Sequence, residues 1–170
     1  MDNLDIKILK LLQTDSRMTV SQISSQINLS IPAVSDRLKK LEAGGIIEKY
    51  VTIINPACFH KELTAVMFIT LERPKFTEKF VEFVQAEDEI LECHYLAGDF
   101  DYALKIITEN TATLEKLLNR IKSAQGVIKT RTIVVLSTVK NQHSIIPHEE
   151  EGNEIKIRRN ENDHRSAQRD

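Results

Sequence analysis

The chain has 170 residues, of which 41% are hydrophobic and 28% charged, and its formal net charge is −2. These values are typical of one or two small globular domains, and they exclude a protein that holds nucleic acid by bulk positive charge. No apolar run is long enough to span a bilayer and no leader pattern opens the chain, so we expect a cytoplasmic protein with no membrane partner. Cys58 and Cys93 lack metal-ligand spacing, which favours reduced thiols.

Three helices are predicted near the start of the chain. The first has apolar residues at helical spacing, at Leu4, Ile8, Leu11 and Leu12. Residues 19–41 then begin with a capping box, Thr19 and Gln22, and Asn28 and Ser30 suit a tight turn followed by a helix cap. Two short amphipathic helices joined in this way are typical of a helix-turn-helix, although another small three-helix unit would show a similar pattern.

The second helix of this pair, residues 30–41, has one apolar and one polar side. Val34, Leu38 and Leu41 recur at i, i+4 and i+7 and face inward. The outward side carries Ser35, Asp36, Lys39 and Lys40, with Arg37 near the boundary. Such a helix can present polar and basic groups to a DNA groove.

A run of strand-forming residues follows the third helix. Gly44-Gly45 ends the helix, and residues 46–54 predict a strand, the wing of a winged helix-turn-helix, before Asn55-Pro56. Residues 1–55 carry seven basic and six acidic side chains. A local basic face and two copies on one DNA are therefore needed for affinity, which favours a dimer.

From residue 63 onward, strands alternate with helices. Strands are predicted over residues 63–71, 90–97, 102–108 and 129–139, and helices around residues 76–84 and 114–121. The order βαββαβ is typical of a ferredoxin-like domain, with both helices on one face of the sheet, so the fold class is α+β. The bare face favours packing against a second copy. The predicted domains are residues 1–55, residues 56–140 and a polar, flexible tail over residues 141–170.

The turn Gly98-Asp99-Phe100-Asp101, within the run from Glu92 to Tyr102, completes a recognisable pattern. Together with Leu41-Glu42-x-x-Gly45-x-Ile47 and Thr130-Arg131-Thr132, and in this order, the chain resembles the Lrp/AsnC family of transcription regulators over residues 2–140. The tail is outside the resemblance.

The resemblance implies a DNA-binding regulator that responds to an amino acid and has no cofactor. It implies that residues 30–41 enter the major groove of double-stranded DNA, with candidate contacts at Ser30, Ser35, Arg37, Lys39 and Lys40. It also implies a homodimer that assembles further to an octamer. The effector would bind at contacts between dimers, with candidate residues Gly98, Asp99, Asp101, Thr130 and Thr132.

Several alternatives remain open at this point. Without the resemblance, a Gly and Asp turn is better explained as a tight hairpin that binds nothing. Siroheme decarboxylases resemble the same two-domain arrangement, and His94 and His60 would then serve a porphyrin, but no His and Arg cluster supports an enzyme. An architectural DNA-compacting protein without an effector would have nearly the same sequence. A metal shared by Asp99, Asp101 and His94 is less favoured still.

Overall fold

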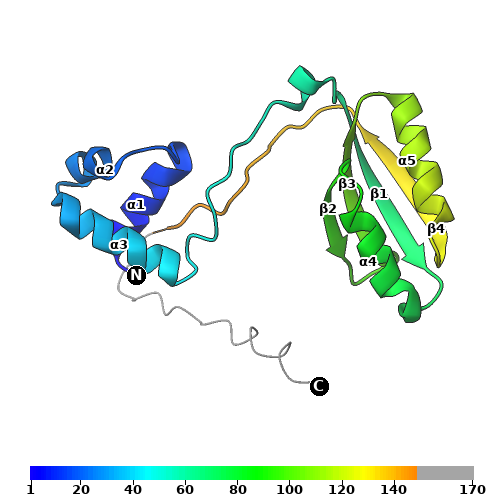
Figure 1. The fold of residues 1–170 in the computed structure, drawn as a ribbon, viewed down its shortest axis with the longest axis horizontal. Helices are drawn as coiled ribbons and strands as arrows, with labels where there is room; N and C mark the ends of the chain where they lie inside the picture. The colour runs from blue at the N-terminus through cyan, green and yellow to red at the C-terminus, as the bar shows by residue number, and fades with distance from the viewer. Residues whose placement is uncertain (149–170) are drawn as a thin grey trace. The chain divides into compact units, whose positions relative to one another are not determined.

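A computed structural model describes residues 1–148 of the chain (Figure 1). The described residues form two compact units, which we call unit 1 and unit 2. Unit 1 comprises Met1–Thr52 and the segment that begins at Gln142, and unit 2 comprises Ile53–Asn141. Within the described residues, no helix is long and apolar enough to cross a membrane.

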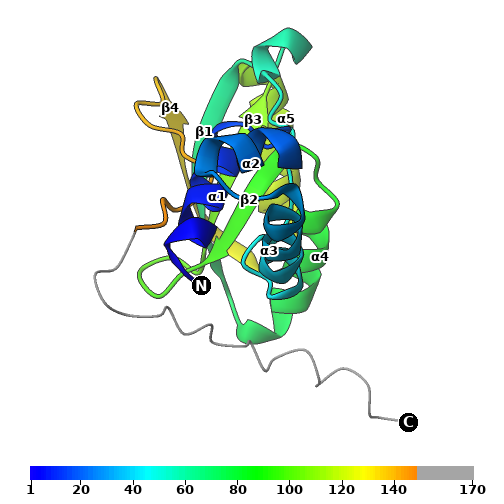
Figure 2. The same ribbon diagram turned by 90° about the vertical axis from the view of Figure 1, so that its left-hand side faces the viewer.

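Three helices build unit 1: α1 (Asn3–Thr14), α2 (Val20–Ile27) and α3 (Ile31–Ala43). Figure 2 shows them from a second direction. Their apolar sides meet in a core whose fully or nearly fully buried members are Ile8, Ile23, Val34 and Leu41. Most positions that helical spacing predicts to face inward belong to this core, but Leu4 of α1 does not. The helix-turn-helix predicted over residues 19–41 is confirmed.

Polar residues form the turn between α2 and α3. At the start of α2, Thr19 accepts a hydrogen bond from the backbone N–H of Gln22, whose Oε1 accepts from the Thr19 N–H at 2.7 Å. Asn28 has left-handed backbone with φ of 55°, and Ser30 Oγ accepts from the Ala33 N–H at 3.4 Å. A left-handed residue and a hydroxyl cap therefore end α2 and start α3 within a few residues.

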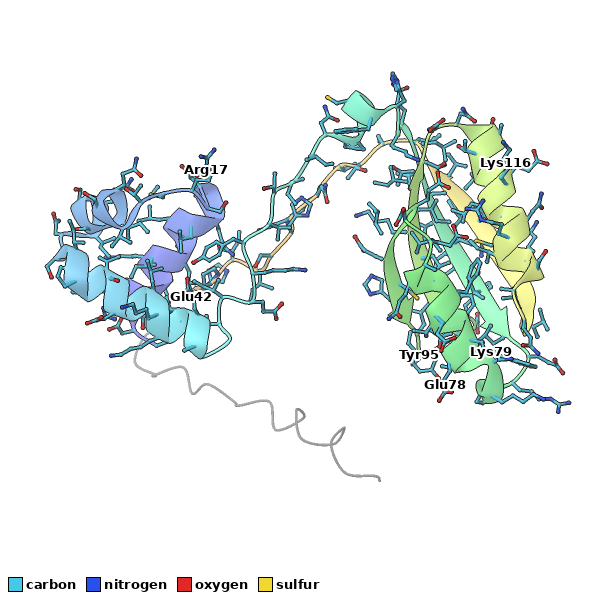
Figure 3. All side chains as sticks on the ribbon, viewed as in Figure 1. Arg17, Glu42, Glu78, Lys79, Tyr95 and Lys116 are labelled. Carbon is cyan, nitrogen blue, oxygen red and sulfur yellow. The ribbon has the colours of Figure 1, made fainter. Side chains whose placement is uncertain are left out.

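The strand predicted over residues 46–54 is not formed, and that prediction is wrong. A strand needs a neighbour to hydrogen-bond its backbone, and no strand within residues 1–148 pairs with this segment. Its exposed side chains include Tyr50, Val51, Ile53 and Ile54. The segment is instead attached to α3 through the Tyr50 hydroxyl, which donates to Glu42 Oε1 at 2.9 Å. Glu42 lies near the end of α3 (Figure 3).

The chain rejoins unit 1 after residue 141. Gln13, near the end of α1, donates from Nε2 to the backbone oxygen of Ile145 at 2.6 Å and to Ser144 Oγ at 3.3 Å. Residues 141–148 have no helix or strand, and the rest of the predicted polar tail, residues 149–170, lies outside the described residues.

Unit 2 contains a single four-stranded antiparallel sheet. Its main elements in chain order are β1 (Leu63–Leu71), α4 (Thr77–Gln85), β2 (Ile90–Tyr95), β3 (Tyr102–Thr108), α5 (Thr111–Ser123) and β4 (Val127–Val135). Short 3-10 helices lie at Pro56–Phe59 and Pro74–Phe76. The strands are ordered β2-β3-β1-β4. The predicted α+β class, with its ferredoxin-like βαββαβ order, is confirmed.

Both helices of unit 2 cover the same face of the sheet (Figure 1). Along β1 and β3 every second side chain is buried, and Ile69 and Leu104 belong to the same core as Phe80 of α4 and Leu117 of α5. The intervening side chains, such as Phe68, lie on the opposite face, which we call the open face.

Strand pairing decides where the strands end. β4 ends at Val135, before the predicted end at residue 139, because Val135 already pairs with Thr64 near the start of β1. Beyond it the chain has no partner strand, and Leu136 is 97% exposed. β2 likewise ends at Tyr95, which pairs with the first residue of β3.

Glu89 connects the segment before β1 with β3 and α5. Its carboxylate accepts hydrogen bonds from the buried Thr108 hydroxyl and from Lys61 Nζ at 3.1 Å, and Arg120 Nη2 lies 3.7 Å away. Burial would raise the pKa of Glu89, but these hydrogen bonds and the charges of Lys61 and Arg120 outweigh burial. The pKa of Glu89 therefore lies below its usual value.

We expect Glu89→Gln to lower the free energy of unfolding at neutral pH by about 1–2 kcal/mol, because charge-assisted hydrogen bonds are lost. The contribution of Glu89 is present above its unfolded pKa, roughly 4.3, and is lost as the pH falls through the lower folded value. The wild type should therefore lose more stability on acidification than the variant. Urea unfolding at several pH values measures this, with the exposed Glu115→Gln as a control of equal charge change. An identical acid dependence of wild type and Glu89→Gln would contradict the assignment.

Candidate DNA-binding and effector sites

The exposed side of α3 carries most of the candidate DNA contacts. Lys39 and Lys40 are exposed, and within residues 1–148 neither forms an ion pair. Ser30 is exposed at the start of α3, where its hydroxyl caps the helix, and Ser35 is half-buried one turn further on. Two exposed ammonium groups beside serine hydroxyls suit phosphate contacts at the edge of a DNA groove.

Arg37 points in another direction. Its Nη1 lies 2.7 Å from Asp2 Oδ2 and 2.7 Å from Asp5 Oδ1, at the N-terminus of α1. Hydrogen bonds to both carboxylates raise the pKa of Arg37 above its usual range. Burial would raise the pKa of Asp2, but hydrogen bonds from the Asp5 N–H and from Arg37 outweigh it and lower that pKa. The structure thus gives Arg37 two acidic partners, whereas Lys39 and Lys40 form no ion pair within residues 1–148.

The candidate effector turn joins β2 and β3. Gly98 and Asp99 are exposed, whereas Asp101 is half-buried. Asp101 Oδ2 accepts from the Leu71 N–H at 2.7 Å, and the Asp101 N–H donates to the Ile69 oxygen at 2.8 Å, which attaches the turn to the end of β1. A Cβ added at Gly98 would meet no atom within 4 Å, and its φ is not positive, so the fold of this chain does not require glycine there.

The turn folds its aromatic side chain onto the open face of the sheet. The ring centroids of Phe100 and Phe68 are 5.4 Å apart, and Lys129 Nζ lies 5.0 Å from the centre of the Phe100 ring. Thr70 is paired with Lys129, and its Oγ1 is buried with no hydrogen-bond partner in residues 1–148. Apolar rings, an ammonium group and an unpaired hydroxyl therefore gather beside the turn that carries Asp99.

Thr130 and Thr132 lie on the other face of the sheet. They pair with Ile69 and Met67 of β1, and residues directly opposite one another in an antiparallel pair share a face. Both partners are fully buried under the helices, whereas Phe100 lies on the open face. A single chain therefore does not bring the two threonines and the turn together on one surface.

Sequence reasoning did not include Phe68, Thr70 or Lys129 among the candidates. These residues are brought together by the register of β1 against β4. The periodicity of two strands so far apart in the chain does not give their register. The enzymatic alternative depends on His94, which is exposed and lies 3.2 Å from Glu92 Oε2. No porphyrin-binding arrangement is evident around it in the described residues.

Known families match both units. Residues 1–48 match a family described as winged helix-turn-helix DNA-binding, and residues 64–145 match the Lrp/AsnC ligand binding domain. The leucine-responsive regulatory protein of Haemophilus influenzae is 37% identical over 149 residues, which are 86% of this chain and 90% of that protein. The protein of that name from Escherichia coli is 36% identical, with 86% and 91% covered.

Solved structures give the same result. The crystal structure of a transcriptional regulator from Neisseria meningitidis in complex with L-Met superposes with a TM-score of 0.80 at 30% identity, covering 85% of this chain and 96% of that one. The relatives are regulators and not enzymes. With a DNA-binding helix-turn-helix in unit 1 and the ligand-binding domain in unit 2, the chain belongs to the Lrp/AsnC family of transcriptional regulators.

Proposed function

We propose that this regulator binds DNA as a homodimer or a larger assembly, up to an octamer, and that an amino acid shifts the balance between assemblies. The observation that supports this is the open face of the sheet. Val66 and Phe68 are only half-buried on that face and Ile133 is 45% exposed, so a second copy has apolar surface to cover. The effector turn folds onto the same face through Phe100. A ligand at the turn would therefore lie at the edge of a subunit contact.

In this proposal α3 enters the major groove. Lys39 and Lys40 contact phosphates, while Ser30 and Ser35 lie near the phosphates and base edges. Two copies would read half-sites about 10–10.5 base pairs apart or a multiple of that distance. Joining two recognition helices also compensates for the weak binding expected of a chain with net charge −2. Since the DNA of bacterial relatives lies in the cytoplasm, we place the regulator there.

The effector site at the turn suits an amino acid with an apolar side chain. Asp99 would pair with the α-ammonium group, and Lys129 would receive the α-carboxylate. The rings of Phe68 and Phe100 would contact the side chain. The L-Met complex of the Neisseria meningitidis relative supports this class of ligand.

Sedimentation velocity of the purified full chain with each amino acid in turn tests the proposal, beginning with L-leucine, L-isoleucine, L-valine and L-methionine. We expect at least one of them to change the distribution of assemblies, because a ligand shifts a population only by its different affinity for the two states. A distribution that no amino acid changes would reject effector-controlled assembly and favour the architectural alternative.

A further inference from the structure

The cluster formed by Arg37, Asp2 and Asp5 joins the recognition helix to the start of α1. In each carboxylate, one oxygen accepts from backbone N–H groups and the other accepts from Arg37. Asp2 Oδ1 accepts from the backbone N–H groups of Leu4 and Asp5, both at 3.0 Å, and Asp2 Oδ2 accepts from Arg37 at 2.7 Å. Asp5 Oδ2 accepts from the Asp2 N–H at 2.9 Å, and Asp5 Oδ1 accepts from Arg37 at 2.7 Å. The capping box of α1 and the anchor of α3 are thus one hydrogen-bonded network.

The direction of Arg37 on α3 agrees with this arrangement. At 100° per residue, Arg37 lies about 60° from the buried Val34. Lys40 lies about 60° further round on the same side, and Lys39 lies about 140° from Val34 on the other side. Arg37 is 28% exposed and the Asp5 side chain 14% exposed. With Asp36, Lys40 and Met1, the cluster lines a hollow between α1 and α3.

Charge also argues against a phosphate contact by Arg37. Two carboxylates and one guanidinium leave the cluster with a net charge of about −1 when all three groups are ionised. A DNA phosphate brought to this guanidinium would meet both aspartates at short range. Lys39, on the other side of α3, forms no ion pair within residues 1–148, and Lys40, although it lines the same hollow, forms none either.

We propose that Arg37 is a positioning residue, which with Asp2 and Asp5 fixes α3 against α1 so that Ser35, Lys39 and Lys40 are held in the orientation that DNA requires. The aspartates then act in DNA binding although they carry the same sign of charge as the phosphates. The proposal therefore predicts a change in DNA affinity opposite in sign to the change that charge alone would produce. Removing negative charge should strengthen binding to a polyanion, but here it should weaken binding to specific DNA.

The experiment compares the full-length wild type with the double variant Asp2→Asn/Asp5→Asn. Asparagine still caps α1, because it is as good a cap as aspartate, but it no longer pairs with the guanidinium charge. The specific probe is a duplex selected by the wild type from a random pool, and the non-specific probe is poly(dI-dC). We expect affinity for the selected duplex to fall about tenfold, in the range typical of a lost specific contact, while affinity for poly(dI-dC) stays equal or rises. Stronger binding to both probes would overturn the proposal.

A third variant separates positioning from direct contact. Adding Arg37→Gln to the double variant removes the guanidinium from a cluster that is already neutral, so no unpaired carboxylates remain to unfold α1. If Arg37 only positions α3, the triple variant binds the selected duplex within about twofold of the double variant, and the dependence of log K on log salt keeps its slope. If Arg37 contacts a phosphate, affinity falls further and the slope flattens by about 0.9 per chain, which would overturn the proposal. Circular dichroism of each variant confirms that α1 and α3 are formed.

Discussion

Replacing Lys39 and Lys40 by glutamine is expected to lower affinity for DNA by about ten- to a hundredfold at physiological salt. Both side chains are exposed on α3, and within residues 1–148 neither has an ion-pair partner that would compete with phosphate. Each phosphate contact releases condensed counterions and contributes about −0.9 to the slope of log K against log salt. Loss of both contacts should therefore flatten the slope by about 1.8 per chain.

The control for this variant is Lys116→Gln. Lys116 is exposed on α5 in unit 2, so its replacement changes the net charge without touching α3 (Figure 3). Fluorescence anisotropy with a selected duplex, at several salt concentrations, measures affinity and slope together. A slope for Lys39→Gln/Lys40→Gln equal to that of the control would show that α3 does not carry the phosphate contacts.

Asp101→Asn is expected to abolish or strongly reduce the response to the amino acid while binding to DNA in its absence stays near the wild-type value. Asparagine keeps a carbonyl oxygen that can accept from the Leu71 N–H, so the turn stays attached to β1. It removes the negative charge that, with Asp99, attracts an α-ammonium group. The measurement is the shift in sedimentation, or in affinity for DNA, caused by the active amino acid.

Asp101→Ala separates the charge from the hydrogen bond. Alanine leaves the Leu71 N–H without its partner. We therefore expect this variant to lose about 1–3 kcal/mol of stability as well as the response to the amino acid. Asp88→Asn, an exposed position before β2, is the control for the change in charge. A full response in Asp101→Asn would remove this aspartate from the effector site.

Local sequence signals predicted most of the fold, because each element is specified by its own residues. Capping by Thr19 and Ser30 and the left-handed Asn28 determine the helix-turn-helix. The pairing of strands that are far apart in the chain is not specified by the residues of either strand alone. The strand predicted over residues 46–54 is not formed because it lacks a partner, and β4 ends at Val135 because β1 begins opposite it.

The sequence locates the candidate residues along the chain, but it does not give the direction of their side chains. Sequence spacing placed Arg37 between the apolar and polar sides of its helix, yet its partners, Asp2 and Asp5, lie more than thirty residues away at the start of α1. Similarly, the sequence makes the turn a candidate effector site, but only the register of the sheet places Lys129 on the same face as Phe100 and Thr130 on the opposite face. Tertiary packing decides such directions, and a single sequence does not show it.

The most direct test of the central claim measures the coupling between DNA and amino acid in both directions. Titration of the full chain with a selected duplex, with and without saturating L-leucine or L-methionine, gives the factor by which the amino acid changes affinity for DNA. Titration with the amino acid, with and without DNA, must give the same factor, because coupling free energy is reciprocal. We expect one amino acid to give a factor of at least about five in both titrations. A factor of one for every amino acid would contradict an effector-responsive regulator.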